Sequence, residues 1–176
     1  ESHGSHELRG KTLGIIGYGN IGSQLSVLAE SLGMRVIFYD VETKMPLGNA
    51  IGKKTMKEVL SEADIVTLHV PGLPSTKNLV NKNNLKFFKK GSILINYSRG
   101  NVVDLNTLST LLKEKQISGA AVDVYPEEPE KNGSHFSSPL QGLSNVILTP
   151  HIGGSTEEAQ VHIGENVSQK LFDYLE

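Results

Sequence analysis

Three kinds of side chain in the second half of the chain could together oxidise an alcohol. They are Arg99, the acids Asp123, Glu127 and Glu128, and His151. A histidine, with a pKa of about 6.5, can accept the hydroxyl proton while the carbon atom gives up a hydride. A carboxylate against the second ring nitrogen selects the tautomer and raises the pKa of the histidine, and an arginine can hold a substrate carboxylate. Each residue alone is equally well explained by a loop or surface position. Only their placement together would indicate an active site.

That placement follows from apolar runs that predict buried strands. The candidate strands are residues 12–16, 35–39, 65–69, 92–96, 118–123 and 146–148, with helical patterns between them. Alternating strands and helices are typical of a doubly wound parallel sheet, and the continuous apolar character of the last four strands indicates cover on both faces. We predict an α/β fold of the Rossmann type, with about six or seven parallel strands and helices on both faces. Ligands of such sheets lie beyond the carboxyl ends of the strands, where Arg99, Asp123 and His151 fall.

Polar residues at the expected helix starts support this fold. The cap candidates are Thr55 and Ser155, each followed three residues later by a glutamate, and Asn81 and Asp104 before helices over residues 82–88 and 105–115. A last helix is expected over about residues 156–175. Residues 41–54 and 125–142 contain proline and glycine without periodicity, and we expect them to be loops.

The sequence Gly17-Tyr18-Gly19-Asn20-Ile21-Gly22 joins the first strand to the first helix. Gly17 allows a sharp turn, Gly19 lets backbone N–H groups approach a pyrophosphate, and Gly22 lets the helix pack close to the sheet. The helix N-terminus also carries a partial positive charge that suits an anion. The glycines alone are a weak signal, because a tight turn without a ligand would also explain them. The flanking strand, the helix and the acid that follows together predict a dinucleotide site.

Asp40 is that acid, and it ends the second strand 18 residues after Gly22. A carboxylate there can accept hydrogen bonds from ribose hydroxyls and would repel the 2′-phosphate of NADP. No arginine follows at residues 41–43, so NAD is the expected cofactor. A methyltransferase would also use a glycine turn followed by an acid, but it explains neither Arg99 nor His151.

Composition excludes several other classes of protein. The 176 residues carry a net charge of −2 and no cysteine, so a nucleic-acid surface, a disulfide framework and a cysteine-based metal site are not expected. No apolar run approaches the ~18 residues of a membrane helix and no signal peptide is seen, so we expect a cytoplasmic protein without a membrane partner. We assign residues 8–176 to one domain and 1–7 to a disordered tail or a remnant of expression. His3 and His6 are better explained as tail residues than as metal ligands, and no metal site is expected.

Three segments at the strand ends resemble signatures of the D-2-hydroxyacid dehydrogenase family. They are Asn96-Tyr-Ser-Arg-Gly100, Ala120-Ala-Val-Asp-Val-Tyr-Pro-Glu-Glu-Pro129 and Leu148-Thr-Pro-His-Ile-Gly-Gly-Ser-Thr156. Residues 46–50 and 152–160 look most like members that act on a phosphorylated 2-hydroxy acid. The resemblance covers nearly all of residues 8–176. It implies an NAD-binding domain, a small-molecule substrate, a homodimer or homotetramer, and a substrate domain and any regulatory domain that this sequence does not include.

The resemblance also implies roles for particular positions. Arg99 would hold the substrate carboxylate and carbonyl, Glu128 would pair with the histidine, and His151 would act as acid and base. The implied cofactor contacts are Gly17, Gly19, Asn20, Ile21 and Gly22 at the pyrophosphate, Asp40 at the adenine ribose, and Tyr97, Ser98, Arg99, Asp123, His151, Gly153 and Gly154 at the nicotinamide. Three more cofactor contacts are expected from position alone. They are His69, Val70 and Pro71, which follow the third strand and could border the adenine. Tyr97 stands where the family usually has a smaller residue.

Two alternatives to this assignment stay open from the sequence. The chain could belong to a relative that uses another 2-hydroxy acid, such as D-lactate, glyoxylate or formate. It could instead belong to an NAD-sensing binding module that keeps the same residues. Because half of the substrate cleft would be missing, we expect this chain alone to bind NAD but to turn over little substrate.

Overall fold

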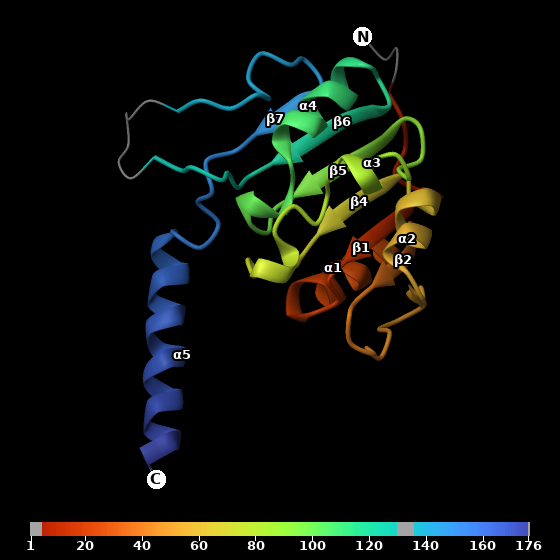
Figure 1. Cartoon of the computed structure of the whole chain (residues 1–176). Helices are drawn as coiled ribbons and strands as arrows, with labels where there is room; N and C mark the ends of the chain where they lie inside the picture. The colour runs from red at the N-terminus through yellow and green to blue at the C-terminus, as the bar shows by residue number, and fades with distance from the viewer. Residues whose placement is uncertain (1–4, 130–135, 176) are drawn as a thin grey trace.

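The computed structural model describes residues 5–129 and 136–175, and most of these form one parallel sheet with helices packed on it (Figure 1). The strands are β1 (Thr12–Ile16), β2 (Arg35–Tyr39), β3 (Ile51–Gly52), β4 (Ile65–Leu68), β5 (Ser92–Asn96), β6 (Ile117–Val122) and β7 (Val146–Leu148). Their order in the sheet is β3-β2-β1-β4-β5-β6-β7, and all neighbours are parallel. The predicted α/β fold is therefore confirmed, with seven strands.

The order of the strands reverses direction between β1 and β4. From β1 the chain builds outward through β2 and β3, and it then returns to place β4 on the other side of β1. Such a reversal opens a crevice at the carboxyl ends of the two strands, because the connections leave toward opposite sides. The glycine turn after β1 lies at this crevice, as a dinucleotide site requires.

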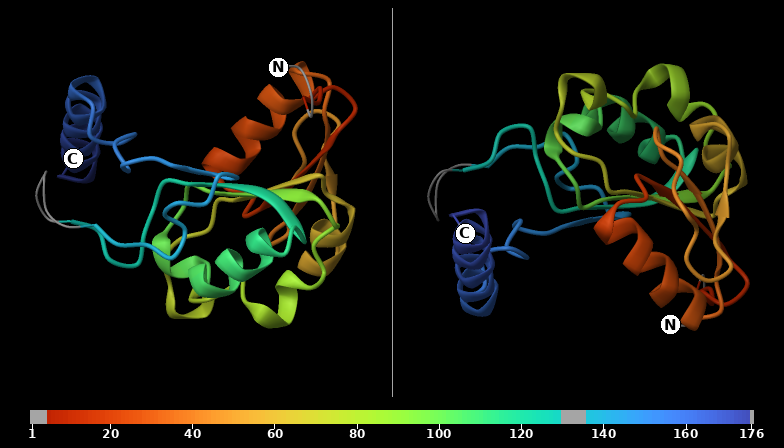
Figure 2. Two further views of the ribbon diagram at one scale, coloured as in Figure 1. Left: turned by 90° about the horizontal axis from the view of Figure 1, so that it is seen from above. Right: turned by 90° about the horizontal axis from the view of Figure 1, so that it is seen from below.

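Helices lie on both faces of the sheet, but unequally. They are α1 (Asn20–Ser31), α2 (Met56–Glu62), α3 (Lys82–Leu85), α4 (Leu105–Lys113) and α5 (Glu157–Leu175), with short 3-10 turns at Pro74–Thr76 and Gly100–Val102. Figure 2 shows α2, α3 and α4 on one face and α1 on the other. The larger core lies under the three helices, and a smaller one, which includes Ala29 of α1, lies on the opposite face.

The face that carries α1 is open over β5 and β7. Ile147 stands in register with Ala121, Ile95 and Ile15, a row that faces α1, yet 63% of Ile147 is exposed. Helix α5 does not cover this face, because it stands away from the sheet and no residue from 157 to 175 is buried (Figure 1). The expectation that the last four strands are covered on both faces is therefore wrong for β5 and β7 on this side, whereas β4 is almost fully buried.

The element boundaries differ from the predicted ones in a few places. The short strand β3 lies inside the expected loop 41–54, where the backbone of Ile51 and Gly52 pairs with β2. The helix expected over residues 82–88 ends at Leu85, and α4 ends at Lys113 rather than at residue 115. Strand β4 ends one residue before His69, so that histidine belongs to the following loop.

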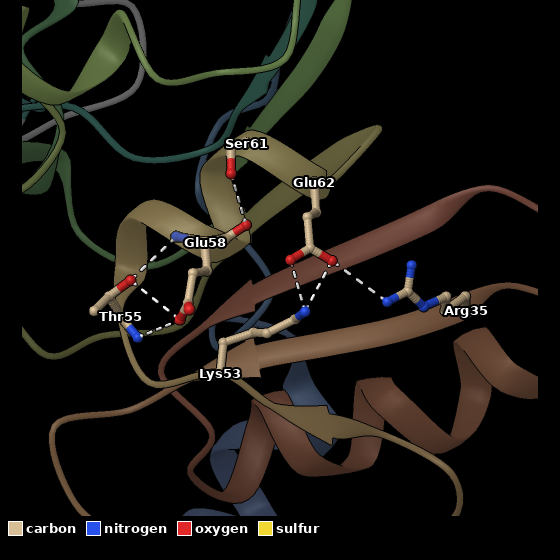
Figure 3. A network of polar contacts seen from close by, with 6 residues as sticks. All are labelled: Arg35, Lys53, Thr55, Glu58, Ser61 and Glu62. Atoms are coloured by element: carbon tan, nitrogen blue, oxygen red, sulfur yellow. Dashed lines mark hydrogen bonds and ion pairs between the residues drawn. The ribbon is translucent and has the colours of Figure 1, made fainter.

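Three of the four predicted helix caps are confirmed. Thr55 forms the full capping box with Glu58, as Figure 3 shows, and Asn81 and Asp104 accept hydrogen bonds from the first turns of their helices. The box predicted at Ser155 is wrong, because α5 begins one residue later than expected. Thr156 takes the cap position there and accepts a hydrogen bond from the N–H of Ala159 at 3.2 Å.

A charged cluster ties α2 to the neighbouring strands. The ammonium of Lys53, just after β3, donates to both carboxylate oxygens of Glu62 at 2.6 and 2.8 Å, and Arg35 of β2 reaches the same carboxylate at 3.4 Å (Figure 3). Hydrogen bonds from these cations lower the pKa of Glu62 despite the opposing effect of burial. The cluster therefore fastens the last turn of α2 to the edge of the sheet that β2 and β3 form.

The expected tail falls partly outside the described residues. Residues 5–7 are exposed and carry no helix or strand, whereas residues 1–4, which include His3, are not described. Within residues 5–129 and 136–175, no helix is long and apolar enough to cross a membrane. The same residues contain no group of three or more histidine, aspartate or glutamate side chains arranged to hold a metal ion.

Candidate active site

His151 and Glu128 form a hydrogen-bonded pair of side chains at the carboxyl edge of the sheet. The Nδ1 atom of His151 lies 2.9 and 3.1 Å from the two oxygens of Glu128. The carboxylate also accepts a hydrogen bond from the backbone N–H of Tyr125 at 3.0 Å. Burial tends to raise the pKa of Glu128, but the bonds from His151 and Tyr125 outweigh it and hold that pKa below its usual value. Glu128 is thus an anion that fixes the ring and leaves Nε2 to face a substrate.

The backbone of His151 adopts a conformation that is uncommon for a residue other than glycine. Its φ is +54°, in the left-handed region, which costs of order 1–3 kcal/mol and occurs most often at functional sites. Asp123 supports this conformation, because its carboxylate accepts hydrogen bonds from the N–H of His151 at 3.0 Å and from the hydroxyl of Thr149. Asp123 therefore holds the backbone of the loop that carries His151, and its contact with the nicotinamide stays a prediction.

Tyr125 is a site residue that the sequence analysis did not single out. Its buried hydroxyl lies 3.0 Å from the carbonyl oxygen of Val122 and 2.9 Å from that of Thr149, so it can donate to either. Burial, and next the nearby carboxylate of Asp123, raise the pKa of Tyr125. This neutral tyrosine joins the ends of β6 and β7, the two strands that lead to Glu128 and His151.

Arg99 lies on the same edge, two strands from His151. It follows β5 whereas His151 follows β7, and at a strand spacing of about 4.8 Å the carboxyl ends of these two strands stand roughly 10 Å apart. The side chain of Arg99 is exposed, its stem lies against Gly72, and Nη1 donates to the carbonyl oxygen of Ser98 at 2.7 Å. A gap of this width can hold a short hydroxy acid between a guanidinium and an imidazole.

The glycine turn has the geometry that an approaching phosphate needs. Gly17 has a φ of +93°, and a Cβ added there would lie 2.4 Å from the carbonyl oxygen of His69. A Cβ on Gly22 would lie 2.2 Å from the carbonyl oxygen of Gly17. A Cβ on Gly19 would meet nothing within 4 Å, so this residue faces open space at the start of α1. The first-turn N–H groups of Asn20 and its neighbours have no capping side chain, which suits a bound anion.

Asp40 is held in place next to this turn by two backbone groups. Its carboxylate oxygens accept hydrogen bonds from the N–H of Tyr18 at 2.7 Å and from the N–H of Glu42 at 3.0 Å. A carboxylate accepts about four hydrogen bonds, so capacity is left for the ribose hydroxyls of a dinucleotide. Lys44 is the nearest cation that the sequence analysis overlooked. It pairs with Glu42, and that bond, followed by the charges of Glu42 and Asp40, raises the pKa of Lys44.

The other predicted cofactor positions lie in several different environments, some buried and some exposed. His69 bonds to the hydroxyl of Thr67 at 3.0 Å, burial lowers its pKa, and with Tyr97 it lines an apolar groove of about 530 Å³ beside α1. Val70 and Pro71 continue the loop after β4, and Gly153 and Gly154 are exposed beyond His151. The side chain of Ser98 is buried against Asn96, so Ser98 can meet a cofactor only through its backbone. These cofactor contacts stay predictions.

A family model for the D-isomer specific 2-hydroxyacid dehydrogenase NAD binding domain matches residues 1–153. The chain belongs to this family. It is 58% identical over 171 residues to a D-3-phosphoglycerate dehydrogenase of Haemophilus influenzae, a match that covers 97% of this chain and 42% of the relative. The chain therefore spans less than half the length of the curated relatives it matches.

Solved structures of the same family have the same fold. A D-isomer specific 2-hydroxyacid dehydrogenase from Lactobacillus delbrueckii ssp. bulgaricus, complexed with NAD, is 32% identical with a TM-score of 0.82; the match covers 94% of this chain and 54% of that one. A glyoxylate reductase from Paecilomyes thermophila is 28% identical with a TM-score of 0.86, covering 98% and 51%. The cofactor of the family is NAD, and the open glycine turn and the fixed carboxylate of Asp40 fit it.

Proposed function

We propose that the protein carrying this chain oxidises 3-phospho-D-glycerate to 3-phosphohydroxypyruvate with NAD, as a D-3-phosphoglycerate dehydrogenase. The observation that carries the proposal is the His151–Glu128 pair with Arg99 two strands away on the same sheet edge. The choice of a phosphorylated substrate is supported by the 58% identity to the Haemophilus influenzae relative of that name. The reaction would be the first step of serine biosynthesis.

The positions of the three residues on one sheet edge support a role for each in this reaction. His151 accepts the hydroxyl proton at Nε2, and the anionic Glu128 at Nδ1 stabilises the imidazolium that forms. Arg99 binds the substrate carboxylate and draws electron density from the adjacent carbonyl as it develops. NAD, when bound, accepts the hydride from the carbon atom. In the reverse direction the same histidine returns the proton.

The oligomeric state and location are part of the same proposal. We infer a homodimer or homotetramer in the cytoplasm, as implied by the resemblance to metabolic dehydrogenases. The open apolar surface beside α1 and the unburied α5 are consistent with further contacts in the complete protein. Sedimentation analysis of the full-length protein tests this, and a monomer at micromolar concentration would contradict it.

A second candidate substrate is an unphosphorylated 2-hydroxy acid. It is supported by the similarity of fold to the glyoxylate reductase, with a TM-score of 0.86 at 28% identity. Arg99, Glu128 and His151 would act in the same way on either kind of acid. The substrate profile of the full-length protein distinguishes them, and preference for glyoxylate or D-lactate over the phosphorylated acid would decide against the main proposal.

The catalytic assignment is tested by His151→Ala in the full-length protein. We expect kcat to fall by at least about two to four orders of magnitude, because general acid–base catalysis supplies that much. His162→Ala is a matched control, since His162 is exposed on α5 and is not one of the predicted site residues. Near-normal turnover of the His151 variant would refute the mechanism.

A further inference from the structure

Asn96, at the end of β5, has a completely buried side chain (0% exposed). Asparagine is uncommon within strands, and a buried amide costs free energy unless its polar atoms are hydrogen-bonded. Its Oδ1 accepts hydrogen bonds from the N–H of Ser98 at 3.2 Å and from the hydroxyl of Ser98 at 2.8 Å, and its Nδ2 donates to the carbonyl oxygen of Arg99 at 3.1 Å. The amide therefore bonds both ends of the short segment that leads to Arg99.

This clamp determines which side chains of the segment point outward. Asn96, Ser98 and Gly100 are buried, whereas Tyr97 and Arg99 between them are exposed. The backbone of Arg99 is extended, with φ −143° and ψ 144°. With its own carbonyl bonded to the buried amide, Arg99 has its side chain on the exposed side of the segment, where the stem lies against Gly72 and Nη1 donates to the carbonyl oxygen of Ser98.

The segment that Asn96 clamps is also packed directly against the loop that carries Glu128. A Cβ added to Gly100 would lie 1.9 Å from the carbonyl carbon of Tyr125, so the two backbones are in direct contact. The N–H of Tyr125 donates to Glu128, and the carbonyl oxygen of Asn96 accepts a hydrogen bond from the N–H of Asp123 at 3.1 Å. A shift of the segment would therefore move Arg99 relative to the His151–Glu128 pair.

We propose that Asn96 is a positioning residue that places the guanidinium of Arg99 for the substrate carboxylate. The inference rests on the proposed function in one respect, namely that Arg99 holds that carboxylate. It also requires asparagine rather than an acid. In Asn96→Asp a carboxylate oxygen would face the carbonyl oxygen of Arg99 without a hydrogen between them, although the side chain keeps its size.

The test compares two conservative variants of the full-length protein, Asn96→Asp and Asn145→Asp. Asn145 is a matched control because its amide donates to the carbonyl oxygens of Leu112 and Ser118 at the opposite end of the sheet. We expect Asn96→Asp to lower kcat/KM for the acid substrate by about 10- to 100-fold, mainly through a higher KM, because a displacement of roughly 1 Å has effects of that size. Asn145→Asp should keep the Kd for NAD within about twofold and alter only the Tm, whereas in Asn96→Asp the Kd for NAD should change less than KM does.

A double-mutant cycle separates positioning from a general loss of structure. If Asn96 acts through Arg99, Asn96→Asp should cost much less in an Arg99→Lys background, where the guanidinium is already gone. An equal cost in both backgrounds would overturn the inference, as would an Asn96→Asp effect on kcat/KM no larger than that of Asn145→Asp. Should Asn96→Asp not fold, Ser98→Ala removes only the hydroxyl bond to Oδ1, and an unchanged KM in that variant would equally overturn it.

Failure of the proposed function gives a different result from failure of this inference. A wild-type protein that does not oxidise 3-phospho-D-glycerate contradicts the proposed substrate, and the same variants are then compared on whichever 2-hydroxy acid is oxidised. Wild-type turnover combined with equal effects of the Asn96 and Asn145 variants contradicts the positioning role alone.

Discussion

Gly19→Ala should weaken NAD binding without destabilising the fold. The residue has a φ of −84°, which alanine adopts readily, and the added Cβ would meet no protein atom within 4 Å. The methyl group would instead occupy the space through which a phosphate reaches the first-turn N–H groups of α1. We expect Kd for NAD to rise by about 10- to 100-fold, which is roughly 1.4–2.8 kcal/mol of binding free energy, with an unchanged Tm.

Gly22→Ala, three residues further along the same motif, should behave differently. Its Cβ would lie 2.2 Å from the carbonyl oxygen of Gly17, so α1 must move by roughly 1 Å to relieve the contact. Overpacking against backbone atoms costs about 1–3 kcal/mol. For a chain of this size a loss near the upper end lowers the Tm by roughly 6–12 °C. NAD binding should weaken as well, since the displaced helix carries the anion-binding groups.

Calorimetric titration with NAD and thermal unfolding of the same two variants provide the measurement. The expected pattern is a selective loss of binding for Gly19→Ala and a joint loss of binding and stability for Gly22→Ala. Gly164→Ala is a control in which the added methyl also meets nothing within 4 Å but lies on α5, outside the predicted cofactor positions. If Gly19→Ala bound NAD as tightly as the wild type, the pyrophosphate would not lie over this turn and the reasoning would be refuted.

Two further predictions concern the charge and protonation of neighbouring residues. Asp40→Ser should weaken NAD binding and reduce the discrimination against NADP, because the carboxylate that repels a 2′-phosphate is removed while Lys44 stays close by. Titration with both dinucleotides measures the ratio of their Kd values. An unchanged ratio would contradict the role of Asp40. Burial lowers the pKa of His69, so the unfolded chain takes up its proton at a higher pH than the folded chain. The free energy of unfolding should therefore fall as the pH drops below about 6.5, and His69→Gln, which cannot titrate, should show a weaker dependence in urea unfolding at pH 5 to 8.

Most of the fold was predictable because its strands are continuous apolar runs bounded by polar or glycine residues. Asp104 and Thr55 likewise marked helix starts through local chemistry that does not depend on the rest of the fold. Strand β3 could not be predicted, since two residues carry no periodicity and their pairing to β2 is a tertiary contact. The shift of the last cap from Ser155 to Thr156 could not be predicted either. Serine and threonine are both good cap residues, and only the path of the backbone decides which of them caps α5.

The candidate site was predictable to the level of strand ends but not of individual contacts. Parallel strands bring their carboxyl ends to one edge, which was enough to place Arg99 and His151 together. The burial of Asn96 and the two carbonyl contacts of Tyr125 depend on how the loops fold back, and neither residue type signals such a role in a sequence. The exposed face over β5 and β7 had no signal either, since an apolar strand looks the same whether or not a helix of the same chain covers it.

Three acids near the end of β6 could each have been the partner of the histidine, and their geometry separates their roles. Glu128 bonds the ring of His151 and Asp123 bonds its backbone N–H, whereas Glu127 lines a separate pocket beside α4. One carboxylate thus sets the tautomer of His151, the proposed base, and another holds the left-handed backbone of the same residue. Because both acids follow β6 while the base follows β7, the pairing of these two strands directly controls the geometry of the base. A substitution in β6 that leaves every site side chain intact would therefore act on the proposed catalysis through His151. It would disturb both the bond from Asp123 to the N–H of His151 and the bond from Glu128 to its ring.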